Sequence, residues 1–389
     1  MLAILRDKTG RSRPPFAEGS IGMSYFDRMK KPIDWIKQPV LDLERFLLRG
    51  VYLLIRRFRG QKPLPDPTRR ILLIRRNRLG DAVCVLPLIE VLKKSDPQLE
   101  VHLLANPYNA VIFQNAPGID QLHILDDKIY LGRIGLPFHP LLRTLRAIHF
   151  DQVVVIGGYS SLAALIAWFS GGRYRIGTSS PKGQIYDLIF DAANPPVDHP
   201  NQHQVTSSAQ VLKLGGFTLP DPLPWATMTR PHPPTPGVLA LCPDVPRKAN
   251  RYPLEKYRLL LERLRQKNGI TEIRLFLTSP DHPLRALEKE KGVIYQATDS
   301  VSAFIQEVSR CESAVAAEGG SAHITAALGL PTVVISGRTA RVSAQWRPWA
   351  AAAVILERHE AIGEITADDI SAALGRVMTD NGKPRGTSL

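Results

Sequence analysis

The strongest constraint on the fold is an alternation of short apolar runs with helical segments, which occurs twice, before and after the proline-rich residues 217–236. Near-continuous apolar runs separated by helical patterns predict parallel strands with helices on both faces of the sheet. The sequence therefore predicts an α/β protein with two Rossmann-like, doubly wound parallel-sheet domains that face a cleft. Ligands in such folds bind at the carboxyl ends of the strands.

The same pattern sets the expected organisation of the 389 residues. We expect a basic extension over 1–68, a first Rossmann-like domain over 69–218, a linker over 219–236, a second Rossmann-like domain over 237–380 and a tail over 381–389. Strands are predicted at 71–74, 101–105, 119–125, 152–156, 238–242, 273–278, 314–317, 332–336 and 352–356. Helices are predicted at 82–94, 131–149, 161–169, 203–214, 254–266, 282–291, 301–310, 322–328 and 367–379.

The cysteines indicate the cellular compartment in which the protein works. Cys84, Cys242 and Cys311 lie far apart, without the paired spacing of a disulfide framework or a zinc site. Met1–Gly10 has no apolar segment typical of a signal peptide. We therefore expect a protein of the reducing cytoplasm.

Basic residues concentrate before the first domain. The first 70 residues hold 16 of the 50 Lys and Arg against 7 of the 36 acidic residues, and so carry +9 of the net charge of +14. Within them, Val40–Phe58 has apolar residues at three- and four-residue steps with arginines on another face, which predicts an amphipathic helix. Such a helix can lie on an anionic membrane surface, and the alternative is packing against the protein itself. Without a nucleic-acid-binding motif, we expect no nucleic-acid partner.

The segment Glu318–Pro331 (EGGSAHITAALGLP) connects two predicted strands through a glycine turn and a short helix. The first amides of a helix are free to bind a ligand, and the helix dipole favours an anion there, so this segment predicts a phosphate site. The alternative is a tight strand-to-helix turn in which His323 is a packing residue.

Several motifs, in this order, resemble those of glycosyltransferase family 9, the bacterial lipopolysaccharide heptosyltransferase group with the two-domain GT-B fold. The resemblance covers about residues 70–378. It rests on the strand, polar loop, Gly-Asp and helix of Ile71–Pro87, the helix His203–Gly215, Arg251-Tyr252-Pro253, Glu318–Pro331, the turn Ser336–Thr339 and the nearby Trp346.

The resemblance implies that Asp81 is the catalytic base. A carboxylate at the mouth of a strand-loop-helix unit can take a proton from an acceptor hydroxyl. The alternative is that Asp81 caps the helix that is predicted to begin at Ala82.

The resemblance places the donor on the C-terminal domain. The backbone amides of Gly319, Gly320 and Ser321 would bind the diphosphate, with the His323 side chain as a further donor. Glu318 matches an acidic residue that touches the donor sugar in the family.

Other donor contacts are implied by matching positions. Asp281 would hold the nucleotide ribose, or is a turn or N-cap residue. Arg247, Lys248 and Arg251 would supply positive charge, or form a solvated basic run. Three positions around this site differ from the family pattern. Glu318-Gly319-Gly320 stands where the family commonly has Asp-Thr-Gly, Asn250 stands in place of Lys, and Arg338 stands in place of Pro.

The expected reaction is inverting transfer of a sugar, heptose or related, from a nucleotide diphosphate such as ADP-heptose to a lipopolysaccharide core or other lipid-linked saccharide acceptor. Arg75, Arg76 and Arg78 would contact acceptor phosphates. We expect neither a metal nor another cofactor, and a monomer on the inner face of the cytoplasmic membrane. The alternatives are a nucleotide-sugar epimerase or hydrolase of GT-B fold, and a non-catalytic sugar-nucleotide-binding protein.

Overall fold

The computed structural model describes residues 62–76, 78–126, 139–180, 185–195, 202–245, 250–359 and 361–379, which belong to one compact unit. The predicted helix over Val40–Phe58 and the predicted tail over 381–389 lie outside the described residues. In the described part of the chain, no helix is long and apolar enough to cross a membrane.

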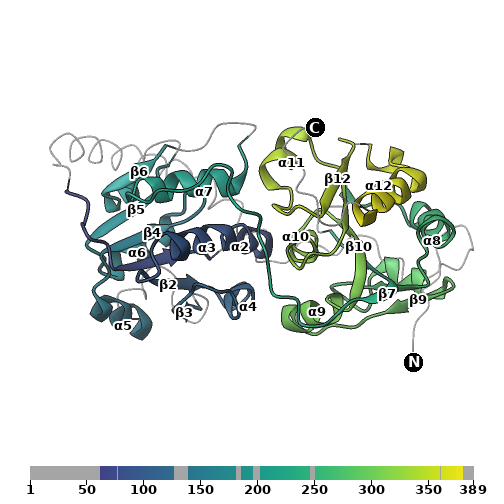
Figure 1. Ribbon diagram of the computed structural model, residues 1–389, viewed down its shortest axis with the longest axis horizontal. Coiled ribbons are helices and arrows are strands. Elements are labelled where there is room, and N and C mark those ends of the chain that lie inside the picture. Colours follow the sequence, from purple (N-terminus) through teal and green to yellow (C-terminus); the bar gives the residue numbers. More distant parts are fainter. Residues whose placement is uncertain are drawn as a thin grey trace, which may run out of the picture. The chain divides into compact units, whose positions relative to one another are not determined.

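The N-terminal sheet has six parallel strands in the order β3-β2-β1-β4-β5-β6 (Figure 1). Its strands are β1 (Arg70–Ile74), β2 (Glu100–Ala105), β3 (Gln121–Ile124), β4 (Gln152–Val155), β5 (Tyr174–Thr178) and β6 (Ala192–Asn194). Its helices are α2 (Leu79–Val83), α3 (Leu86–Ser95), α4 (Ala110–Phe113), α5 (Pro140–Ile148), α6 (Ser161–Phe169), the 3-10 helix η2 (Ile185–Ile189) and α7 (Gln204–Lys213).

The C-terminal sheet also has six parallel strands, in the order β12-β11-β10-β7-β8-β9. Its strands are β7 (Thr235–Cys242), β8 (Glu272–Leu275), β9 (Val293–Tyr295), β10 (Cys311–Ala317), β11 (Thr332–Ser336) and β12 (Ala353–Glu357). Its helices are α8 (Leu254–Asn268), η4 (Pro283–Lys289), α9 (Val301–Val308), α10 (Gly320–Ala327), α11 (Ala340–Trp346), η5 (Ile362–Glu364) and α12 (Ala367–Thr379). The predicted class, two Rossmann-like parallel sheets, is confirmed.

Alternate residues of the central strands enter different apolar clusters, as expected for a parallel sheet that is buried on both faces. On β1, Ile71 and Leu73 pack on one side, and Leu72 and Ile74 on the other. In the C-terminal sheet, α8 and α12 cover one face together, and α10 packs on the opposite one (Figure 1).

Each sheet has one point where the strand order reverses. In the N-terminal sheet the reversal falls between β1 and β4, and in the C-terminal sheet between β7 and β10. In doubly wound folds the crevice at the carboxyl end of such a pair is the usual ligand site. These two points place the loop that follows β1 and the segment Glu318–Gly320 where ligands are expected.

Two predicted helices differ in the structure. The helix expected over 82–94 is interrupted, because α2 ends at Val83 and α3 begins at Leu86 with a proline in its first turn. Pro87 lacks the N–H that a continuous helix would need. The helix expected over 282–291 is a 3-10 helix, η4, which also begins with a proline, Pro283.

Candidate functional site

Asp81 lies in the first turn of α2, which begins at Leu79 rather than at Ala82. Its Oδ2 accepts a hydrogen bond of 3.4 Å from the Arg78 N–H, and its Oδ1 lies 3.5 Å from Arg75 Nη2. Only 8% of the residue is exposed. The carboxylate therefore both contacts the helix start and forms an ion pair at the carboxyl edge of the N-terminal sheet.

Arg75 is 1% exposed, and its guanidinium faces the protein interior. Its Nε donates to the Asp81 carbonyl oxygen at 3.1 Å, and its Nη1 donates to the Ile156 carbonyl oxygen at 2.8 Å. The predicted contact of Arg75 with acceptor phosphates does not fit this placement, because its donors are turned to internal acceptors. The other two arginines of the loop are accessible: Arg76 is half-buried and Arg78 is exposed.

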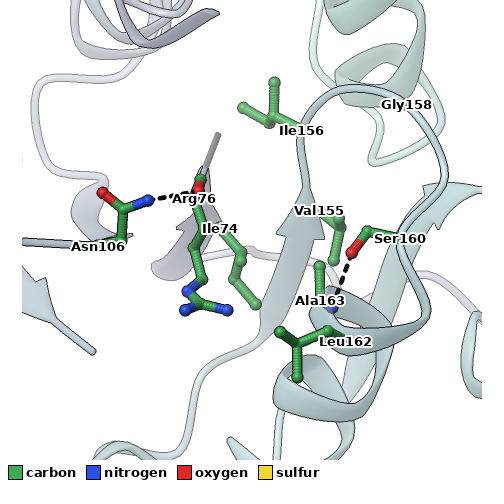
Figure 2. Close-up of a pocket in the computed structure, with 9 residues that line it drawn as sticks. All are labelled: Ile74, Arg76, Asn106, Val155, Ile156, Gly158, Ser160, Leu162 and Ala163. Atoms are coloured by element: carbon green, nitrogen blue, oxygen red, sulfur yellow. Dashed lines mark hydrogen bonds between the residues drawn. The ribbon is translucent and has the colours of Figure 1, made fainter. Parts of the chain in front are cut away.

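Arg76 lines a cavity of about 160 Å³ at the reversal between β1 and β4. In Figure 2 its side chain runs beside Ile74, and Asn106 Nδ2 donates to its carbonyl oxygen at 2.6 Å. Ser160, the N-cap of α6, lines the same cavity. Ligand pockets commonly measure about 300–1,000 Å³, so this cavity suits one group of a larger ligand. Sequence reasoning missed both Asn106 and Ser160.

The predicted diphosphate site begins where β10 ends. Gly319 is the N-cap of α10 in an extended conformation, and the first intrahelical bond runs from the His323 N–H to the Gly319 carbonyl oxygen. The backbone N–H groups of Gly320–Ala322 come before that bond and so have no partner within the helix, as at any helix start. Gly319, Gly320 and Ser321 are partly exposed. The helix that was predicted from the glycine pair is confirmed, and its role in binding a ligand stays a prediction.

Glu318 forms an ion pair with Arg338, which lies in the loop that follows β11. The side chain of Glu318 is 12% exposed and that of Arg338 is 25% exposed. The loop position is fixed nearby, since the Glu318 N–H donates to the Ile335 carbonyl oxygen and the Arg338 N–H donates to Ser336 Oγ. Two of the positions that depart from the family pattern are therefore partners in the structure.

His323 is a buried packing residue. Its Nε2 donates to the Trp346 carbonyl oxygen at 2.9 Å, and its Nδ1 lies 3.9 Å from Cys84 Sγ. Burial lowers the pKa of His323 to about 4 and raises the pKa of the Cys84 thiol to about 12, so both groups are neutral. The ring is thus occupied by internal partners, and its predicted role as a donor to the diphosphate is not supported by this placement.

Helices α2 and α10 pack directly on each other through small residues. A Cβ added at Gly80 would lie 2.7 Å from His323 Cδ2, and one added at Gly320 would lie 3.1 Å from Leu79 Cβ. Real Cβ atoms rarely approach so closely. Glycines therefore bring the helix that carries Asp81 against the helix that begins at the predicted diphosphate site.

The remaining predicted donor contacts are spread over the C-terminal sheet. Arg251 is half-buried and its Nε donates to the Val245 carbonyl oxygen at 3.4 Å, whereas Asp281 is exposed in a turn. Arg247 and Lys248 lie outside the described residues. Sequence reasoning missed Asp244, which follows β7 and pairs with His282 at 3.3 Å. Among the described residues, no group of three His, Cys, Asp or Glu could hold a metal ion.

The strand orders and the carboxyl-edge positions of these residues define the class: a two-domain, Rossmann-like α/β protein of the GT-B type. The chain belongs to glycosyltransferase family 9 (heptosyltransferase), whose sequence profile matches residues 138–366. The resemblance inferred from the motifs is confirmed.

Three solved structures share the fold. The glycosyl transferase family 9 from Veillonella parvula has 15% identity and a TM-score of 0.66, covering 80% of this chain and 98% of that one. E. coli ADP-heptose lps heptosyltransferase II has 18% identity and a TM-score of 0.63, covering 81% and 100%. E. coli heptosyltransferase WaaC with ADP has 15% identity and a TM-score of 0.65, covering 79% and 99%. At such identities the likeness shows the fold alone.

One curated relative matches a smaller region. It is a Haemophilus influenzae protein described as "Putative glycosyltransferase", 31% identical over 116 residues, which are 30% of this chain. The chain spans 32% of the length of that relative.

Proposed function

We propose that this protein is an inverting glycosyltransferase that moves a sugar from a nucleotide diphosphate to a lipid-linked saccharide acceptor. The observation that carries the proposal is the packing of α2 on α10. It brings the helix of Asp81, at one strand-order reversal, against the helix start at Gly319 and Gly320, beside the other.

The proposed chemistry uses these two elements. Asp81 takes the proton of an acceptor hydroxyl, whose oxygen attacks C1 of the donor sugar. The bond between C1 and the phosphate oxygen breaks on the opposite face, which inverts the configuration, and the nucleotide diphosphate leaves with the bonding electrons. The amides at the start of α10 stabilise the charge that develops on this leaving group. No metal ion is needed for that step in this proposal.

The donor is proposed to be ADP-heptose or a related nucleotide sugar. Support comes from family membership and from the E. coli neighbours, one described as an ADP-heptose heptosyltransferase and another as a complex with ADP. The cavity beside Arg76 supports an acceptor with an anionic group, since a guanidinium favours phosphate or carboxylate there. The basic sequence of residues 1–68 supports action at the cytoplasmic face of an anionic membrane.

The test is transfer of sugar from ADP-heptose to glycolipid extracted from a strain that lacks this protein, followed by mass spectrometry. Asp81→Asn should lower turnover by about 10²- to 10⁴-fold, the usual contribution of a general base, and leave the dissociation constant for ADP nearly unchanged. Unchanged turnover would reject Asp81 as the base. Conversion or hydrolysis of the donor without acceptor would favour the epimerase or hydrolase, and binding without any turnover would favour the non-catalytic protein.

A further inference from the structure

Arg75 stands out among the residues of the candidate site because it is a large cation that is almost fully buried. Desolvation of a guanidinium is costly unless internal acceptors replace water. Burial accordingly lowers the pKa of Arg75, and the nearby Asp81 acts in the opposite direction. A residue of this kind at the end of β1 calls for a specific role.

Two of the three nitrogens of the Arg75 guanidinium contact one residue, Asp81. Nε contacts the carbonyl oxygen of Asp81 at 3.1 Å, and Nη2 lies 3.5 Å from its carboxylate. Nη1 is fixed by the Ile156 carbonyl oxygen at 2.8 Å, at the end of the neighbouring strand β4. The fork thus connects the Asp81 main chain, the Asp81 side chain and the sheet edge.

The lack of a side chain at Gly157 leaves room for the Arg75 guanidinium. This glycine has a φ of +112°, and a Cβ there would lie 1.7 Å from Arg75 Nη1. A side chain at 157 would therefore be strained by its backbone conformation and would displace the guanidinium. The glycine and the arginine form one unit although they are far apart in the sequence.

The contacts orient the Asp81 carboxylate without saturating it. Its two charged or polar contacts within this loop, 3.5 Å to Arg75 Nη2 and 3.4 Å to the Arg78 N–H, are longer than strong charge-assisted hydrogen bonds. A carboxylate held in this way keeps its orientation and can still accept a proton.

We infer that Arg75 is the positioning residue of the proposed base: it holds Asp81 in the orientation needed for proton abstraction and does not itself bind the acceptor. The inference rests on the proposed function. A packing role alone does not require the guanidinium to contact both the main chain and the carboxylate of the same residue.

The test compares Arg75→Met and Arg75→Lys with the wild-type protein, using ADP-heptose and glycolipid from the strain that lacks this protein. Loss of orientation at a reacting group costs about 10²-fold, so Arg75→Met should lower kcat by about that factor while the KM for both substrates changes little. Arg75→Lys keeps the positive charge but lacks the planar guanidinium, so its kcat should lie between those of Arg75→Met and the wild type. The matched control is Arg70→Met, which removes an arginine at the other end of β1 that pairs with Glu100 at 2.7 Å. It should leave kcat unchanged.

A double-mutant cycle guards against a general loss of folding. In an Asp81→Asn background, Arg75→Lys should lower the residual rate no further, since the group that it positions is already gone. Equal losses in both backgrounds would overturn the inference, as would Arg75→Met with wild-type kcat. A wild-type protein that turns over no donor would overturn the proposed function and this inference together.

Discussion

Acidification from pH 7 to pH 5 should destabilise this protein through three buried histidines, His123, His203 and His323. Burial lowers the pKa of each to about 4. Their ring nitrogens have internal partners at 2.8–2.9 Å: His123 contacts His102, His203 the Arg347 carbonyl oxygen and His323 the Trp346 carbonyl oxygen. These contacts hold the rings in place in the neutral form.

The sign follows from proton linkage. The pKa of each histidine in the unfolded chain is near 6.5, so below that pH the unfolded state binds protons that the folded state does not. The free energy of unfolding is therefore highest above pH 6.5 and falls as the pH drops towards 4. A pKa of about 4 corresponds to a loss of about 2 kcal/mol per histidine between pH 7 and pH 5, or about 6 kcal/mol for all three.

The measurement is a series of urea unfolding curves from pH 7 to pH 5. His203 offers a clean variant because it caps α7 by accepting from the Val205 N–H, and asparagine is also a good N-cap. His203→Asn should reduce the slope of unfolding free energy against pH by about 1.2 kcal/mol per unit near pH 5.5. The control is His149→Asn, because His149 is exposed and its left-handed φ of 58° suits asparagine. An identical slope for His203→Asn and wild type would refute the argument.

Three further perturbations test other parts of the structure. Gly80→Ala should lower the unfolding free energy by about 1–3 kcal/mol in urea, because the new Cβ overpacks the ring of His323; unchanged stability would mean that α2 and α10 are not in close contact. Glu318→Ala should destabilise the protein more than Glu318→Ala combined with Arg338→Ala, since the single change leaves a partly buried cation unpaired. If the double variant unfolds at a lower temperature than Glu318→Ala, the ion pair between Glu318 and Arg338 is excluded. Removal of the first 60 residues should release the protein from anionic vesicles and preserve ADP affinity. A truncated protein that still sediments with vesicles would contradict a membrane-binding role of the basic extension.

The sequence predicted the fold well where strands are apolar and buried on both faces. The runs that became β1, β7 and β11 carry this signal without a polar residue in their interior. Three strands were missed: β5, which contains Arg175, and the three-residue strands β6 and β9. Strands β6 and β9 lie at sheet edges, where fewer neighbours demand an apolar sequence, so local pattern could not reveal them.

The position of the candidate site could be predicted from the sequence, but several of its side-chain contacts could not. Asp81 and Glu318 follow central strands, so their placement at the carboxyl edges follows from the order of strand, loop and helix. The burial of Arg75 could not be foreseen, and a packing role for His323 was only one of two alternatives. Their partners, Ile156 and Cys84, lie 81 and 239 residues away in the sequence, and both contacts exist only once the tertiary structure has formed.

The departures at Glu318 and Arg338 follow a common physical logic. An anionic side chain immediately before α10 would repel a diphosphate at the same helix start, because both compete for the positive end of the dipole. The ion pair with Arg338 offsets that charge locally. Arg338→Pro alone should therefore weaken ADP binding more than Arg338→Pro combined with Glu318→Gln, because the double change also removes the uncompensated negative charge. Calorimetric titration of the two variants with ADP would decide this, and equal affinities would show that the pair does not affect the diphosphate site.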